Sequence, residues 1–321
     1  MLIRTVRRCS ICGIALLGLL LSLMSGGPAA KAAGSYVWIF PKAALIAAEQ
    51  DSANPIFDTL VNGTSQTVYQ VMNPSIPACA VNDNEPPVKG TNPDLFVTQH
   101  EFSGYGVTPQ SLEQSVPSGT QAVLLDQESW CQTSSEDMAD PADNDQAIAR
   151  AAKTDNLTFT TAPALDLFSC PKSAVSCLQC PEDVPGGLTC TPCTPGTADW
   201  QCYYDYDIAG QEAINAKVID IQAQSLEADL NSKGLAANWD TFVSETIAQA
   251  RQANPGVTVL VGLTNRYTSD AGVLEQDLQY ALDHGADGAW INEDPGYSTS
   301  LMDGVVCHFI GAPAGQTCTS P

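Results

Sequence analysis

Two carboxylates separated by one residue, Asp126 and Glu128, follow a short apolar run at residues 122–125. Side chains alternate between the two faces of a strand, so a strand here places Asp126 and Glu128 on one face, together with Ala122 and Leu124. Two acids this close repel each other, and one is expected to keep its proton near neutral pH. A protonated carboxyl beside an ionised one can serve as a general acid. The alternative is that both acids only bind loop backbone or an arginine.

A second run, at 217–224, alternates the polar residues Asp220, Gln222 and Gln224 with apolar ones. Polar groups on an inner face are costly unless they bond one another or a ligand. We expect Asp220, the deepest, to brace the interior. Gln222 and Gln224, nearer the rim, are candidates for binding ligand hydroxyls.

Three further candidates come from the last part of the chain. Trp290 and Asn292 share a strand face, and Tyr267 follows another apolar run. A tryptophan at a barrel mouth offers a platform for the apolar face of a sugar ring, although buried tryptophans also simply pack. Arg266 is expected to pair with Glu128, Glu293 or Asp294.

Eight strand-like apolar runs must position these residues, and helix-like segments alternate with them. The runs lie at 36–40, 67–72, 95–100, 122–126, 157–162, 218–222, 258–262 and 288–291. The expected helices lie at 43–50, 110–114, 142–153, 239–252 and 271–284, with Asn238 as a candidate cap for the fourth. Such alternation predicts a parallel sheet of the α/β class. Because no glycine-rich phosphate turn follows the first run, a closed (β/α)8 TIM-type barrel is favoured over a doubly wound sheet.

In such barrels the active site lies at the C-terminal ends of the strands. The run that ends with Asp126 and Glu128 is therefore the predicted centre of any activity. The three histidines share no ligand spacing, so neither a metal site nor a cofactor is predicted.

The N-terminus has the pattern of a secretory signal peptide, which we assign to residues 1–32. Three arginines precede an apolar stretch, and a small-residue stretch with Ala30-Lys31-Ala32 follows it. The rival is a retained membrane anchor, but the apolar stretch is shorter than a bilayer span. Residues 33–321 are then one secreted barrel domain, expected to be a monomer without membrane contact after cleavage.

The charge of the chain excludes one class of partner. Without the four basic residues of 1–32, nine basic residues face 36 acidic ones, a net charge of −27. Such an acidic surface repels phosphate backbones, so nucleic acid is excluded as a partner.

Ten cysteines follow the predicted signal peptide, and six of them lie in a Cys-rich insertion at residues 169–202, after the fifth run. An even number in an exported chain indicates disulfides, which would staple this insertion. Cys177-x2-Cys180 and Cys190-x2-Cys193 also fit a structural zinc site, which remains the alternative.

Several short motifs resemble the family 18 glycoside hydrolases, which include chitinases and inactive lectin-like relatives. Asp126-Gln127-Glu128 resembles the end of their D-x-x-D-x-D-x-E motif, Thr160-Thr161-Ala162-Pro163 their T-A-A-P turn, and Trp290 their eighth-strand tryptophan. Residues 221–224 lie where plant-type members have Q-F-Y. The chain is also similar to exported bacterial proteins without an assigned activity, which share V-x-D-I-Q-A-Q and A-R-x-A-N-P.

The resemblance implies an exported hydrolase of N-acetylated glycans. Glu128 would protonate the glycosidic oxygen, and Asp126 would orient the acetamido group whose own carbonyl attacks the anomeric carbon. Leu124 replaces the family's inner aspartate and Gln224 its tyrosine, which favours a barrel that binds glycans without cutting them. A third hypothesis is a two-carboxylate glycosidase with Glu227 or Glu293 as the partner of Glu128.

Overall fold

The computed structural model describes eleven stretches of the chain. They are 35–50, 57–63, 65–71, 90–91, 95–102, 121–127, 141–165, 199–224, 236–268, 270–292 and 299–311. All of them belong to one compact unit, Gly34–Pro321.

The strands pair in parallel, each with its neighbour in sequence, and β1 pairs with β8 to close a barrel. They are β1 (Val37–Pro41), β2 (Thr67–Val71), β3 (Leu95–Phe102), β4 (Ala122–Gln127), β5 (Thr158–Pro163), β6 (Val218–Ile221), β7 (Thr258–Thr264) and β8 (Gly288–Asn292). The prediction of a parallel α/β fold is confirmed. The strand ends agree with the predicted runs to within two residues.

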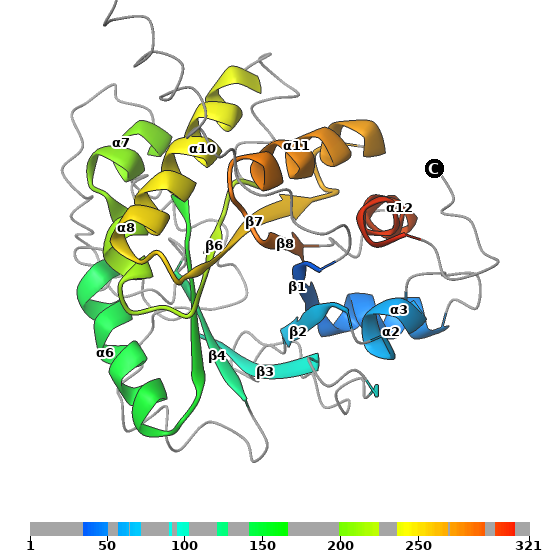
Figure 1. Ribbon diagram of the computed structural model, residues 1–321, viewed down its shortest axis with the longest axis horizontal. Coiled ribbons are helices and arrows are strands. Elements are labelled where there is room, and N and C mark those ends of the chain that lie inside the picture. The colour runs from blue at the N-terminus through cyan, green and yellow to red at the C-terminus, as the bar shows by residue number, and fades with distance from the viewer. Residues whose placement is uncertain are drawn as a thin grey trace, which may run out of the picture. The chain divides into compact units, whose positions relative to one another are not determined.

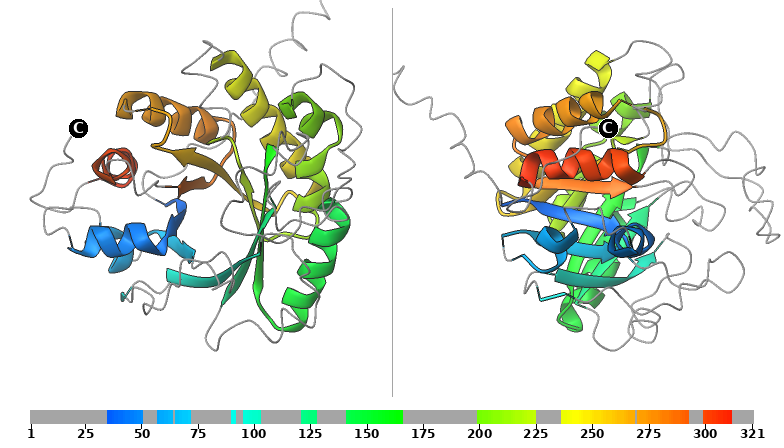
Figure 2. Two further views of the ribbon diagram at one scale, coloured as in Figure 1. Left: turned by 180° about the vertical axis from the view of Figure 1, so that it is seen from behind. Right: turned by 90° about the vertical axis from the view of Figure 1, so that its right-hand side faces the viewer.

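Helices cover the outer side of the strands (Figures 1 and 2). They are α2 (Lys42–Gln50), α3 (Phe57–Val61), α6 (Pro141–Thr154), α7 (Asp199–Asp205), α8 (Ile208–Ala213), α10 (Ala236–Ala253), α11 (Ala271–Asp283) and α12 (Thr299–Ile310). Most of them contact two neighbouring strands: α6 contacts β4 and β5, α8 contacts β5 and β6, and α10 contacts β6 and β7. The described helices therefore pack against the outer face of the strands.

Four of the predicted helices correspond to α2, α6, α10 and α11, while the predicted helix at 110–114 lies outside the described residues. The proposed cap Asn238 is wrong, because α10 already begins at Ala236. The helices α3, α7, α8 and α12 were not predicted. The first three are short, at five to seven residues, and so carry little periodic signal.

The apolar core has two parts that follow strand alternation. Outside the strands, Val123 and Leu125 of β4 pack with the helices in the larger cluster. Inside the barrel, Ala122 and Leu124 of the same strand join Ile39, Leu260 and Trp290 in a smaller cluster. The predicted division of β4 into an inner and an outer face is therefore what the structure has.

The closing seam of the barrel depends on a glycine. Gly288 begins β8, and a Cβ at this position would overlap the backbone of Val37 on β1, with the Val37 nitrogen 2.8 Å away. Because backbone atoms cannot move aside without breaking the β1–β8 pairing, a side chain at Gly288 would open the seam.

Several predictions concern residues outside the described stretches, including the signal peptide and nearly all of the Cys-rich insertion. Of the ten later cysteines, Cys202 and Cys307 are described, and each forms a disulfide bond. Among the helices described, none is both long and apolar enough for a membrane span.

Candidate functional site

A line of hydrogen-bonded polar side chains crosses the C-terminal end of the barrel from β6 to β4. Gln222 lies just after β6, and its Nε2 donates to Oδ1 of Asp126 on β4 at a distance of 2.5 Å. The same nitrogen donates to the carbonyl oxygen of Ala162 at the end of β5, at 2.6 Å. Gln224 Nε2 donates in turn to Gln222 Oε1 at 3.2 Å. We call Asp126, Gln222 and Gln224 the amide ladder.

Strand geometry explains why these three side chains meet. In parallel strands side by side, inner-face residues of equal height lie next to one another, and Asp126 is paired in register with Ala162 of β5. Gln222 continues the inner face of β6, so its amide reaches across the end of β5 to Asp126. All three residues of the amide ladder are buried. One Asp126 oxygen is thereby held by a donor from a different strand.

Asp220 lies one step deeper on the inner face of β6 and is fully buried. Neither of its carboxylate oxygens has a hydrogen-bond partner among the described residues. Burial raises the pKa of Asp220 well above its usual value, because desolvation penalises the charged form. Burial therefore favours the neutral form of Asp220, in which its hydroxyl could donate a hydrogen bond.

Gly262 on β7 makes room for the deep part of this site. A Cβ at Gly262 would lie 3.1 Å from Asp220 Oδ2 and would overlap Gln224 Oε1. The two oxygens therefore face the same point of β7 backbone. Gln224 Oε1 also has no partner within the described stretches, so it and the two Asp220 oxygens are buried polar atoms without a hydrogen bond there.

The other predicted binding residues surround the amide ladder at different depths. Trp290 pairs in register with Gly262, is only 4 % exposed, and its Nε1 lacks a partner among the residues described. Asn292, half-buried, ends β8 beside Thr264. Tyr267 is 37 % exposed, and the Arg266 guanidinium lies 5.6 Å from its ring centroid. Trp290 thus offers an N–H donor within the barrel, and Tyr267 lies at the surface.

Glu128, the predicted acid, lies outside the described residues, as do Glu227, Glu293 and Asp294. The structure therefore brings together Asp126, Gln222 and Gln224 and leaves the distance from Asp126 to Glu128 a prediction. The arrangement that is present offers a carboxyl acceptor on Asp126, amide donors on the two glutamines, and the buried acid Asp220. These groups suit a ligand rich in hydroxyl and amide groups. Within the described stretches no three histidine, cysteine or acidic residues are placed to hold a metal ion.

A second acidic cluster, which the sequence analysis missed, lies outside the barrel between α6, α8 and β5. Asp145 of α6 and Glu212 of α8 are both buried, and Thr161 Oγ1 of β5 donates to Glu212 Oε2 at 2.6 Å. Asn215 Nδ2 donates more weakly to Asp145 Oδ2 at 3.4 Å. We call Asp145 and Glu212 the acid pair.

Desolvation raises both pKa values in the acid pair. It raises the pKa of Asp145 to about 7, against the opposing effect of hydrogen bonds from Thr161 and Asn215. It also raises the pKa of Glu212 well above its usual value, and the charge of Asp145 adds to this rise. One available signal for the pair was helical spacing, since Asp145 shares a buried face with Ile148 and Ala152 three and seven residues later.

Comparisons with known proteins give no family for the chain. No protein-family model and no curated protein matches it. Solved structures that resemble it include RipC from Yersinia pestis, at 10 % identity and a TM-score of 0.40 over 87 % of this chain and 96 % of that one. An archaeal fructose-1,6-bisphosphate aldolase is 13 % identical, with a TM-score of 0.40 over 87 % and 95 % of the two chains. The endoglucanase Cel6 from Mycobacterium tuberculosis is 14 % identical, with a TM-score of 0.37 over 68 % and 75 %. At such low TM-scores these likenesses carry no argument about function.

Proposed function

We propose that the mouth of the barrel binds a carbohydrate, and that the chain is a secreted, glycoside-hydrolase-like protein in which Glu128 is the general acid. The observation that carries the proposal is the hydrogen bond from Gln222 to Asp126, which assembles an acidic and amide-rich site at the C-terminal ends of β4 and β6. Carbohydrate sites combine such polar groups with an aromatic side chain, and Trp290 and Tyr267 are the aromatic candidates.

In the proposed hydrolysis, Glu128 donates its proton to the glycosidic oxygen as the bond to the leaving group breaks. Asp126 accepts a hydrogen bond from the N–H of the substrate's acetamido group and so directs its carbonyl oxygen toward the anomeric carbon. Gln222 fixes one oxygen of Asp126, which limits the directions from which that substrate N–H can approach. Gln224 and Asn292 are the candidates for binding the sugar hydroxyls.

A second candidate function is glycan binding without turnover. The observation in its favour is Leu124, which is fully buried in the apolar cluster inside the barrel directly below Asp126. A leucine there cannot exchange a hydrogen bond with Asp126, whereas the family resemblance implies an aspartate at this position. Transition-state stabilisation by that group would be absent, and single missing donors of this kind cost about 3 kcal/mol.

Export belongs to the same proposal. Residues 1–32 as a signal peptide would deliver residues 33–321 outside the cell, where extracellular glycans are the ligands. The net charge of −27 after its removal would keep the protein soluble there, as a monomer away from nucleic acid. Disulfides in the 169–202 insertion fit the same oxidising environment.

The proposal is tested on the purified chain with a glycan array and reporter glycosides, comparing the wild type with Glu128→Gln and Glu49→Gln. Glu49 is an exposed acid on α2, so its variant changes the net charge by the same amount away from the barrel mouth. Turnover that falls at least about a hundredfold only in Glu128→Gln supports the hydrolase. Binding without turnover in all three proteins supports the second candidate. Neither binding nor turnover in any of them rejects both.

A further inference from the structure

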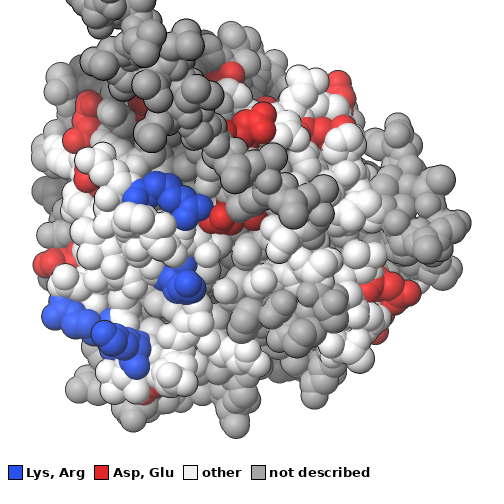
Figure 3. Space-filling model, viewed as in Figure 1, with Lys and Arg blue, Asp and Glu red and all other residues white. Residues whose placement is uncertain are grey.

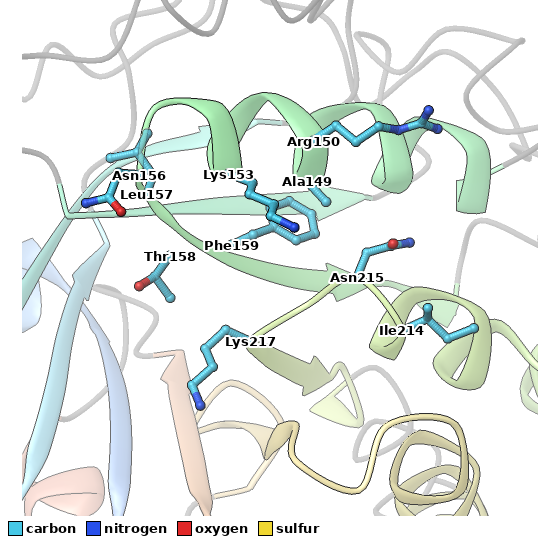
Figure 4. A pocket seen from close by; sticks show the side chains of 10 residues that line it. All are labelled: Ala149, Arg150, Lys153, Asn156, Leu157, Thr158, Phe159, Ile214, Asn215 and Lys217. Carbon is cyan, nitrogen blue, oxygen red and sulfur yellow. The ribbon is translucent and has the colours of Figure 1, made fainter.

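A pocket of about 570 Å³ opens at the other end of the barrel, beside the N-terminal ends of β5 and β6. Its wall on one side is the last turns of α6, and on the other side the segment that joins α8 to β6 (Figure 4). Thr158, the first residue of β5, and Lys217, which directly precedes β6, line it. The pocket therefore lies at the strand ends opposite to those that carry the amide ladder.

Three basic residues line this one pocket: Arg150, Lys153 and Lys217. They are a third of the nine basic residues that follow residue 32, in a chain whose formal net charge is −23. Basic side chains gather on the face of the molecule shown in Figure 3, some of them on the side where α6 lies. The pocket is thus a local concentration of positive charge on a strongly acidic protein.

Among the described residues, no carboxylate forms an ion pair with the basic side chains of this pocket. The ammonium groups of Lys153 and Lys217 have no hydrogen-bond or ion-pair partner, within the part of the chain that the structure describes. Arg150 donates to Gln146 on its own helix, which is a neutral acceptor. By contrast, Arg251 on α10 forms an ion pair with the carboxylate of Asp287, so its charge is compensated within the protein. The basic side chains of the pocket are therefore available to bind an anion from solution.

Neutral donors and an apolar wall complete the pocket. Asn156 and Thr158, where the chain enters β5, and Asn215, in the segment before β6, also line the pocket (Figure 4). Ile214, 63 % exposed, and the half-buried Leu157 add an apolar border. The charged ends of Arg150 and Lys217 point in different directions in Figure 4, so an ion in the pocket would be held mainly by the flexible lysines turning toward it. Ammonium, amide and hydroxyl groups suit the several oxygens of a divalent oxyanion better than a single carboxylate.

We propose that this pocket binds a compact divalent oxyanion, a phosphate or sulfate group. The ligand is either the free ion or such a group on a small neutral body that packs against Ile214 and Leu157. A polyanion is disfavoured, because most of its charges would lie outside the pocket against an acidic surface. At physiological ionic strength charges beyond about 8 Å are screened, so the local cations prevail over the net charge of the protein.

The test is isothermal titration calorimetry of the purified chain at constant ionic strength with inorganic phosphate, sulfate, acetate and glucose 6-phosphate. Phosphate and sulfate are expected to bind saturably at one site, and acetate to bind much more weakly. Lys153→Gln and Lys217→Gln are each expected to weaken phosphate binding about tenfold, which corresponds to about 1.4 kcal/mol. If glucose 6-phosphate binds more tightly than phosphate, the ligand is a phosphate or sulfate group on a small neutral body. If the two bind equally, the ligand is the free ion.

The matched control is Ala47→Glu, which makes the same change in net charge on an exposed position of α2. It is expected to change phosphate affinity less than about twofold because of screening. No saturable binding of phosphate or sulfate overturns the proposal, and so does a loss in Ala47→Glu as large as in Lys153→Gln. Urea unfolding midpoints equal to the wild type show that each variant is folded. Glycan binding at the mouth is expected to be unchanged in both lysine variants, so this proposal and the proposed function fail independently.

Discussion

Buried acids occur on both sides of the barrel wall, and the two sides treat them differently. Inside, Asp220 lies alone among uncharged amides, with its carboxylate oxygens unbonded in the described structure. Outside, Asp145 and Glu212 face each other between α6 and α8, and Thr161 and Asn215 donate hydrogen bonds to them. No lysine or arginine forms an ion pair with any of these three acids, as far as the described residues go.

The difference shows how a chain with few basic residues buries carboxyl groups. Desolvation disfavours the charged form of the carboxyl groups on both sides. Bound protons, rather than ion pairs with lysine or arginine, therefore lower the cost of burying these acids. Inside, no described residue donates to Asp220, and desolvation raises its pKa well above the usual value without an opposing hydrogen bond. Outside, the donated hydrogen bonds oppose desolvation and hold the pKa of Asp145 at about 7. Of these three acids, Asp145 in the outer pair is therefore the one expected to change its charge near neutral pH.

The largest expected effect is on the pH dependence of stability. The pKa of Asp145 is raised from 3.8 to about 7, so between these values the folded protein binds more protons than the unfolded chain. Its stability must then fall as the pH rises from about 4 to about 7 and level off above that, by up to about 4 kcal/mol. Urea unfolding at pH 5 and pH 8 measures the larger part of this fall, about 3 kcal/mol, and Asp145→Asn should reduce it.

The difference between the wild type and Asp145→Asn isolates this contribution, because burial also raises the pKa of Asp277 to about 7. Glu49→Gln, on exposed α2, is the control and should leave the fall as it is in the wild type. Since Asp145 and Glu212 interact, the measured midpoint belongs to the pair. An equal fall in Asp145→Asn and the wild type would contradict the comparison, because the outer pair would then be no more titratable than Asp220.

A smaller effect is expected from Thr161→Val, which removes the hydroxyl that donates to Glu212 but keeps the shape of the side chain. Losing a hydrogen bond to a buried acid costs about 1–3 kcal/mol. The loss should be greater at pH 8 than at pH 5, because the hydroxyl stabilises the charged form. Chemical unfolding at both pH values measures it.

The neighbouring residue supplies the matched control for Thr161→Val. Thr160 lies on the other face of β5, is equally buried, and its hydroxyl lacks a hydrogen-bond partner in the described structure. Thr160→Val should cost little or even stabilise, because no bond is lost and an unsatisfied polar group is removed. Equal losses in the two variants would show that burial of the hydroxyl, rather than its bond to Glu212, sets the cost.

The inner positions of this comparison could be predicted from the sequence, and the outer pair could not. The expected bracing role of Asp220 is wrong, because neither of its carboxylate oxygens has a hydrogen-bond partner among the described residues. Strand alternation placed Asp126, Gln222 and Gln224 on the inner face, because a period of two is visible in a single strand. The acid pair needs α6 and α8 to pack on the same strand, and α8 has only six residues. Periodicity does not detect so short a helix, and spacing along the chain does not relate Asp145 to Glu212.

Other features of the site depend on packing that sequence patterns do not encode. The role of Gly262 follows from where Gln224 and Asp220 project across β7, which becomes visible only once β6 and β7 are in register. Likewise, Trp290 was assigned to the inner face from alternation, but its depth, at 4 % exposure, depends on its neighbours inside the barrel. For Glu128, both the strand face and the depth of the side chain remain predictions, because it lies outside the described residues.

The smallest expected effect is the one that tests the inner side most directly. If Asp220 is neutral, Asp220→Asn replaces one uncharged group with another of the same shape, and its amide can still donate toward Gln224. Stability at pH 7 should then change by less than about 1 kcal/mol in urea unfolding, with no change in its pH dependence between 5 and 8. If Asp220 were instead ionised, the variant would remove an unpaired buried charge and would be stabilised by several kcal/mol. A large gain in stability would therefore show that the barrel interior holds a charge, and that the inner and outer acids do not differ in the way their surroundings indicate.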